Sequence, residues 1–362
     1  MNKRFDNTQD IPIKGGDVLS SKRNHGYDKK FFLIFWGSVV LLISIFLTSL
    51  AVGRYSVPIS NAARIILSHF FDITKTWSDI EQSVVMDLRF PRTAAAMIVG
   101  AAMALSGGAY QSIFKNPMCS PDLLGVSSGA CVGAAIAILS NSSSLMIQGG
   151  AFLGGVIAVT ITVTIPKLLR NDSTVMLILT GVVVSSMMSS VMSLLKYVAD
   201  TDTKLAEITY WTMGSFATVK IEDLMPVLPT IIIPMAIILL MRYRLNVLSL
   251  GDHEARSLGV NLRRIRGIFI ICSTLLTASC VCLAGTIGWI GLVIPHTSRM
   301  LVGSDNEKML PVSMTFGAVF MVVIDILCRT ISAAELRIGI LTGVIGTPFF
   351  IFILYQQNRN LR

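Results

Sequence analysis

The sequence predicts an all-α protein, a polytopic transmembrane helical bundle of about ten helices. Of its 362 residues, 53% are hydrophobic and 14% are charged, whereas a soluble domain carries about 25% charged residues. The mean hydropathy is +0.69. The apolar residues form unbroken runs close to the roughly 20 residues that cross a membrane. Such runs exclude a β-barrel, whose strands alternate apolar and polar residues.

The chain begins with a polar, basic segment at residues 1–30. Its composition predicts a disordered cytoplasmic tail, because it has too few apolar side chains to form a core. The apolar run that follows, Phe31–Val52, is too long for a signal peptide and lacks a small-residue cleavage pattern. This run is therefore expected to be the first membrane span.

Further apolar segments complete a transmembrane domain over residues 31–356. They lie near 92–113, 122–140, 145–166, 174–196, 224–241, 267–286, 287–302, 309–329 and 338–355. The segment 287–302 is short and contains Pro295, His296 and Arg299. Its composition predicts a broken helix, which is tolerated only where protein or a cavity covers it.

The distribution of positive charge predicts the orientation. An even number of spans places both termini on one side of the membrane. About two-thirds of the 30 Lys and Arg residues then lie on that side, which predicts cytoplasmic termini and a location in the cytoplasmic membrane. Under this topology Arg89, Arg92 and Arg329 lie near the outer face.

Two segments of the chain form a faint internal repeat. Leu105–Ser106–Gly107 precedes Asn116–Pro117 with the same spacing that separates Leu283–Ala284–Gly285 from Ile294–Pro295. The second copy begins an odd number of spans after the first, so the two would be inverted in the membrane. Inverted repeats are typical of transporters, although a chance match in an apolar, Gly-rich sequence is the alternative.

Small residues recur in the second predicted span. Ala96, Gly100, Ala104 and Gly108 follow one another every four residues and form one stripe on a helix. Because lipid offers little hydrophobic gain for helix association, close approach of small residues supplies the contact instead. The stripe predicts a tightly packed interior helix. Simple helix packing with no role in transport is the alternative for any one stripe.

A polar break follows at residues 115–122, KNPMCSPD. Two prolines four residues apart do not both fit inside one regular helix, so this segment is expected to connect the second and third spans. Asn116 and Met118 are candidates for lining a constriction, and an ordinary Asx-Pro turn is the alternative. Ser173 and Thr174, at the inner mouth of the fifth span, are further candidates for a translocation pathway.

The cysteine, histidine and glycine patterns predict no catalytic residue, no metal site and no cofactor. The six cysteines lie mostly inside apolar runs without a CxxC pair, and the four histidines are scattered. The chain also lacks the phosphate-binding pattern GxxxxGK[ST]. It is therefore not expected to be an enzyme, and any ATP would be bound by a partner subunit.

Four segments carry a resemblance to a known family. They read LRFPRTAAAMIVGAAMALSGGAYQSIFKNPMCSPDLLGVSSGA (88–130), LSLGDHEARSLGVNLRRIR (248–266), LAGTIGWIGLVIPHTSRMLVGSDNEKMLP (283–311) and ISAAELRIGILTGVIGTPFFIFIL (331–354). In this order they resemble the FecCD family, the permeases of ABC importers for iron chelates and vitamin B12. Departures are Met118 and Cys119 in the Asn-Pro loop, Arg337 where proline is usual, and a longer basic N-terminus.

The resemblance implies a set of partners: a second permease subunit, identical or not, two ATP-binding subunits, and an extracytoplasmic substrate-binding protein. It implies that Arg89, Arg92 and Arg329 receive acidic residues of the docking protein, which suits the two-point pairing of guanidinium with carboxylate. Interfacial anchoring is the alternative for the first two. For Arg329, pairing with Asp325 one helical turn away is a further alternative.

The connector at 248–260 is expected to be a short helix on the cytoplasmic side. From its residues alone it is a loop with flanking positive charge. The resemblance implies that it is the coupling element that contacts the ATPase subunit. The implied contact residues are Gly251, Asp252, Glu254, Ala255, Leu258 and Gly259.

The function expected from the resemblance is the membrane-spanning subunit of an ABC importer that carries an iron chelate such as a ferric siderophore. Cobalamin and haem are alternative cargoes. An ion-coupled secondary transporter is the alternative from another class, and it predicts buried carboxylates near the middle of the membrane. Asp325 is the clearest acid inside an apolar run, towards one end. A membrane scaffold without transport is the third hypothesis, and no nucleic acid is expected as a partner.

Overall fold

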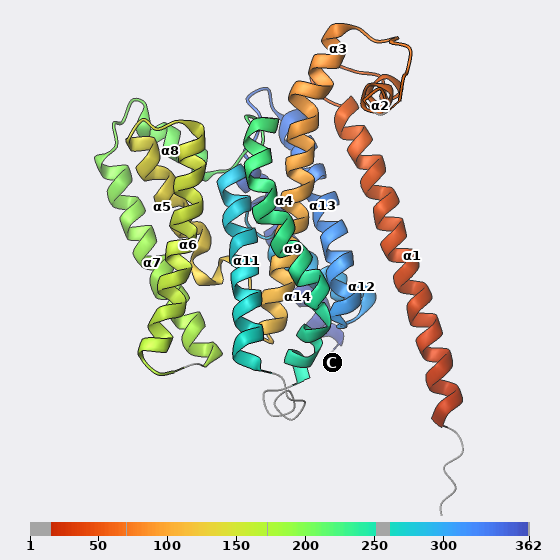
Figure 1. Cartoon of the computed structure of the whole chain (residues 1–362), viewed down its shortest axis with the longest axis vertical. Helices are drawn as coiled ribbons and strands as arrows, with labels where there is room; N and C mark the ends of the chain where they lie inside the picture. Colours follow the sequence, from red (N-terminus) through yellow and green to blue (C-terminus); the bar gives the residue numbers. More distant parts are fainter. Residues whose placement is uncertain (1–15, 70, 172, 251–260, 361–362) are drawn as a thin grey trace, which may run out of the picture.

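The computed structural model describes residues 16–69, 71–171, 173–250 and 261–360, and this part of the chain is an all-helical bundle (Figure 1). Seven of its helices are long and apolar enough to cross a membrane. The first is α1 (Gly16–Ala51). The second is α4 (Phe90–Ile113), which continues without a break from two short helices that begin at Asp79. The others are α6 (Ser144–Leu168), α7 (Thr174–Val198), α9 (Ile221–Leu250), α11 (Leu262–Ala284) and α13 (Asn306–Ile331).

Three shorter apolar helices complete the predicted set of spans: α5 (Val126–Leu139), α12 (Ile290–Val302) and α14 (Ile338–Asn360). The connections contain α2 (Ile59–Leu67), α3 (Asp79–Ser83), the π-helix η1 (Val84–Arg89), the 3-10 helix η2 (Pro121–Leu124) and α8 (Lys204–Thr212). In Figure 1, α1 lies at one edge of the bundle and α7 at the other, while α2 and α3 lie beyond the C-terminal end of α1.

Several helix boundaries differ from the predicted ones. α1 begins at Gly16, so residues 16–30 are helical rather than disordered as expected, while residues 1–15 lie outside the described chain. α9 likewise continues beyond residue 241 to Leu250. In both cases a membrane span has already nucleated the helix, and each added residue costs little compared with starting a new one.

The predicted break inside 287–302 is wrong in its position. The chain breaks before α12, where Gly285 and Trp289 both have positive φ angles of 71° and 70°. Pro295 then lies inside one continuous helix. Since proline has no N–H for the carbonyl four residues earlier, Gly291 needs another donor. The Gln111 side chain of α4 lies 3.5 Å from that carbonyl and donates to the Leu292 carbonyl at 3.1 Å.

α4 lies at the centre of the fold. In its most apolar 18-residue window 78% of the residues are buried, compared with 6% for α1. α4 is therefore surrounded by other helices, whereas most of α1 lies on the surface of the bundle. α4 runs antiparallel to α11: Ser106 donates to the Ser273 carbonyl at 3.1 Å, and Cys280 lies 3.8 Å from the Val99 carbonyl. Antiparallel packing of these helices is what an inverted repeat requires.

The residues matched in the repeat do not share local structure, however. Gly107 lies inside α4, whereas Gly285 ends α11 with a positive φ. Pro117 follows α4 in a loop, whereas Pro295 is helical. The two helices therefore run in opposite directions, as an inverted repeat requires, but the residue-by-residue match does not extend to their ends.

Glycines allow the helices to touch through their backbones. The predicted small-residue stripe lies on the face of α4 that packs against α13: a Cβ added at Gly100 would lie 2.2 Å from the Gly317 carbonyl oxygen. A Cβ at Gly107 would lie 1.8 Å from the carbonyl oxygen of Gly291 in α12. The pair α5 and α6 meets in the same way, with Gly133 against Gly150. In lipid these close contacts supply packing that the hydrophobic effect does not.

Candidate functional site

The three arginines predicted for the outer face lie where α4, α13 and the end of α1 converge. Arg89, Arg92 and Arg329 retain only 6%, 8% and 7% of their surface exposed. A buried guanidinium is costly unless its donors are satisfied, so their partners decide what they do.

Arg89 binds the C-terminal end of α1. Its Nη1 atom donates to the carbonyls of Leu50 and Ala51 at 2.7 and 2.8 Å, and its Nη2 atom donates to the carbonyl of Tyr55. The last carbonyls of a helix have no partner within the helix and carry its negative dipole end, so a cation there is favourable. Arg89 ends the π-helix η1, which carries the chain into α4.

Arg92 and Arg329 share the fully buried carboxylate of Asp325. Arg92 Nε donates to Asp325 Oδ1 at 2.8 Å, and Arg329 Nε lies 3.3 Å from Oδ2 as an ion-pair contact. Arg92 Nη1 also binds Glu335 at 2.9 Å. Arg329 Nη2 donates to the Ser49 carbonyl at 3.0 Å, so this network also reaches α1.

The network balances its charges: two guanidiniums face two carboxylates in a region poor in water. Asp325 pairs with Arg329 as one of the alternatives predicted, and Arg92 and Glu335 are partners that the sequence did not reveal. A carboxylate fixed between two arginines is poorly suited to exchanging ions during transport, so the geometry disfavours the ion-coupled alternative.

This geometry also argues against the docking role predicted for Arg89, Arg92 and Arg329. To reach a docking protein each guanidinium would have to leave its internal acceptors. Breaking a buried ion pair costs roughly 3–5 kcal/mol. The three side chains instead join α1, α4 and α13.

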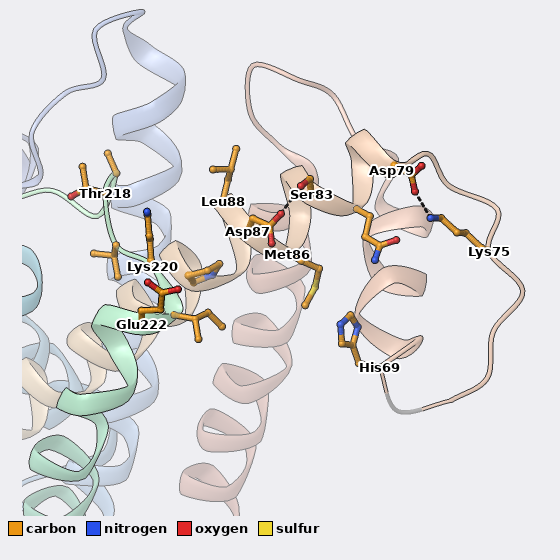
Figure 2. Close-up of a pocket in the computed structure, with 15 residues that line it drawn as sticks. His69, Lys75, Asp79, Ser83, Met86, Asp87, Leu88, Thr218, Lys220 and Glu222 are labelled. Atoms are coloured by element: carbon orange, nitrogen blue, oxygen red, sulfur yellow. Dashed lines mark hydrogen bonds and ion pairs between the residues drawn. The ribbon is translucent and has the colours of Figure 1, made fainter.

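A groove of about 840 Å³ lies at the same end of the molecule (Figure 2). One wall is the segment of α2, α3 and η1, and the other is the approach to α9. Lys75 and Asp79 form an ion pair on the first wall, and the Asp87 carboxylate accepts a hydrogen bond from Ser83. Lys220 is exposed on the opposite wall. This groove offers charged groups to an approaching protein, which the buried arginines do not.

A second candidate surface is the outward face of α7. Ser186, Ser189, Ser190 and Ser193 are exposed there. A shallow groove of about 470 Å³ separates this face from η2, with Ser120 and Asp122 on its far side. The sequence signal for this face is the pattern SSMMSS at 185–190, which contains no charge and no proline and was not among the predicted pathway residues.

α7 and η2 lie in close contact because α7 has a glycine at the crossing. A Cβ at Gly181 would lie 2.1 Å from the Leu123 carbonyl oxygen. Asp122 turns inward: it is half-buried and its carboxylate accepts a hydrogen bond from the Ser127 hydroxyl in α5. The groove therefore presents hydroxyls and aliphatic groups rather than a free charge.

The four predicted pathway residues lie at helix ends. The Asn116 side chain accepts from the Met118 N–H at 2.9 Å, and Met118 is exposed. Ser173 caps α7 by accepting from the Met176 N–H at 3.2 Å, and Thr174 begins the helix. The bonds of Asn116 and Ser173 are local, so the structure gives them turn and capping roles.

The predicted coupling residues lie outside the described chain. These are Gly251, Asp252, Glu254, Ala255, Leu258 and Gly259. The described helices on either side, α9 and α11, approach that segment from the same end of the bundle as the N-terminal part of α1 (Figure 1).

Within the described residues, no three His, Cys, Asp or Glu side chains gather in a way that would hold a metal ion. The six cysteines are free and buried, as expected for thiols that pack as small apolar side chains.

Comparison with known proteins agrees with the fold. The sequence profile of the FecCD transport family matches residues 41–356. A molybdate import system permease protein of Haemophilus influenzae is 37% identical over 90% of this chain and 96% of its own. A probable iron chelatin transport system permease protein of Helicobacter pylori is 36% identical over 75% of this chain and 82% of its own.

A solved structure is also similar. It is described as an inward-facing conformation of a putative metal-chelate type ABC transporter, with a TM-score of 0.79 and 36% identity, and the match covers 89% of this chain and 99% of that one. The resemblance carried by the four sequence segments is thus confirmed, and the chain belongs to the FecCD transport family as a multi-pass inner-membrane permease subunit of an ABC importer, which is not itself an enzyme.

Proposed function

We propose that this permease carries a metal chelate, with a ferric siderophore as the first candidate, along a path that α7 lines and a second permease subunit closes. Two ATP-binding subunits drive it from the cytoplasmic side, where both termini lie, and a substrate-binding protein delivers the cargo to the outer end.

The observation that carries this proposal is the neutral, hydroxyl-rich face of α7. Its exposed serines are Ser186, Ser189, Ser190 and Ser193, and the helix has no charged residue between Thr174 and Leu195. Acyl chains gain nothing from facing hydroxyls, whereas a water-filled path between two subunits does. A neutral lining suits a bulky, already coordinated metal that must pass without being held.

Molybdate is the second candidate cargo, because a relative named for molybdate matches nearly the whole chain. A small free oxyanion is usually recognised by guanidinium, ammonium or N–H donors. The α7 face offers none of these charged groups, which favours a chelate. Cobalamin and haem remain the alternatives within the same class.

Transport by the reconstituted assembly tests the cargo. Vesicles that contain this chain, its ATPase and its binding protein should take up an iron-55 siderophore when ATP is present, and should ignore molybdate, cobalamin and haem. Ser189→Leu should lower the uptake rate several-fold. Ser44→Leu, at an exposed serine of the lipid-facing α1, is the matched control and should not. Molybdate uptake alone would replace the proposed cargo, and uptake driven by an ion gradient without ATPase would refute the importer mechanism.

The docking of the binding protein has its own test. Arg54 and Lys220 are exposed at the outer end, so we expect Arg54→Glu with Lys220→Glu to weaken delivery while basal ATPase activity is unchanged. Unchanged delivery in this variant would remove the proposed docking surface without affecting the cargo assignment.

A further inference from the structure

A groove between α6 and α11 opens on the surface of the bundle, where Thr160, Thr164 and Ile271 are exposed, and it is not part of the α7 face or the outer groove. Its volume is about 280 Å³. It is lined by Val156, Val159, Thr160, Val163, Thr164, Lys167, Gly267, Ile270, Ile271, Thr274 and Leu275. One cation therefore lies among side chains that are otherwise aliphatic or hydroxyl-bearing.

The hydroxyl hydrogens of the α6 wall are already used within the helix. Thr160 donates to the Val156 carbonyl at 2.7 Å and Thr164 donates to the Thr160 carbonyl at 2.6 Å. Most of the other lining side chains are aliphatic, so the groove is mainly apolar along its length. Gly267 keeps it open, because a Cβ there would meet no atom within 4 Å.

The dimensions of the groove match one leaflet of a bilayer. From Val156 to Lys167 the α6 helix rises roughly 16 Å, and half of the hydrocarbon core is about 15 Å thick. Lys167 lies at the end where α6 finishes and α11 begins, which is the end that holds the N-terminal part of α1 (Figure 1). An acyl chain inserted here would place its headgroup beside that lysine.

Positive charge gathers at this mouth. Lys167 and Arg170 are exposed at the end of α6, and Arg264 is exposed one helical turn from Gly267 on the same side of α11. Basic pockets between transmembrane helices near a membrane surface bind the headgroups of anionic lipids.

We propose that the groove between α6 and α11 binds one anionic phospholipid, with an acyl chain along the groove and its phosphodiester at Lys167. Zwitterionic lipids carry no net negative charge to pair with the basic residues at the mouth of the groove, so they bind more weakly. The inference is independent of the cargo, because it uses neither the α7 face nor the outer groove.

Lipid binding to the purified, delipidated full chain tests this. Native mass spectrometry and thermal midpoints are measured with dioleoylphosphatidylglycerol, with dioleoylphosphatidylcholine and with inorganic phosphate. We expect one tightly bound phosphatidylglycerol, about fivefold weaker after Lys167→Gln, since each cation near an anionic surface contributes on that order. Gly267→Leu, which fills the groove, should weaken both lipids.

Matched controls lie on α1, away from the groove. Lys30 is exposed on that helix, and a Cβ at Gly37 would meet no atom within 4 Å, so Lys30→Gln and Gly37→Leu should leave lipid binding unchanged. Equal affinity for the two lipids, or an unchanged preference after Lys167→Gln, would overturn the proposal. If inorganic phosphate alone reproduces the stabilisation, the site binds a free anion and the lipid assignment is wrong.

Discussion

The contact between α4 and α13 predicts that Gly100→Ala destabilises the bundle. The added Cβ would lie 2.2 Å from the Gly317 carbonyl oxygen and 2.6 Å from Met321 Cβ, whereas real Cβ contacts are essentially never below 3.0 Å, so the helices must separate by about 0.8 Å. Such overpacking costs roughly 1–3 kcal/mol. The higher helix propensity of alanine offsets ~0.5–1 kcal/mol of this cost. The net loss is therefore ~0–2.5 kcal/mol, and about 1 kcal/mol at the middle of both ranges. With an unfolding entropy of ~2 cal/mol/K per residue, a loss of about 1 kcal/mol lowers the thermal midpoint of this 362-residue chain by roughly 1–2 °C.

The six buried, free cysteines supply the assay, because a thiol-reactive fluorogenic dye reports their exposure as the protein unfolds. Gly37→Ala is the matched control, since its Cβ meets nothing within 4 Å, and its midpoint should be unchanged or slightly raised. Gly100→Leu and Gly108→Leu should lower the midpoint further and reduce the yield of folded protein. If Gly100→Leu is produced and melts like the wild type, the two backbones are not in tight contact and the reasoning is refuted.

The ion network, Arg89 and the cysteines give four further predictions. Asp325→Asn leaves two buried guanidiniums without their shared carboxylate and should cost about 3–5 kcal/mol in the same melting assay. Glu335→Gln, at a side chain one-third exposed, should cost less than about 1 kcal/mol. Arg89→Met removes the donors at the end of α1, and limited trypsin digestion should then cleave after Arg54 faster than in the wild type. Finally, a membrane-impermeant maleimide should label none of the cysteines before heating, and labelling of the native protein would contradict their burial.

The sequence was sufficient for the spans and for the packing face of α4. Both depend on local patterns: runs of apolar residues for the spans, and the four-residue spacing from Ala96 to Gly108 for the stripe. The partner of that stripe was not predictable, because Gly317 is more than two hundred residues away along the chain.

The arginines show why the role of a residue is harder to predict from the sequence than the position of a span. The sequence correctly placed Arg89 and Arg92 at the start of the second span, but a charge near the outer face is compatible with docking, anchoring or an internal bond. The hydrogen-bond partners distinguish these roles, and the sequence does not reveal them. Arg89 binds backbone carbonyls, which every residue has, and Arg92 binds Asp325, which is far away along the chain. The π-helix that ends at Arg89 also has no marker in the sequence pattern.

The attachment of α1 through arginines has a consequence for biosynthesis. α1 leaves the ribosome first among the spans, yet few of its residues pack against protein. The carbonyl acceptors at its end belong to Ser49, Leu50 and Ala51, and their arginine donors are translated later. The last donor, Arg329, is translated 280 residues after Ser49. The earliest helix to enter the bilayer is therefore among the last to reach its final place, once the ninth span has been inserted.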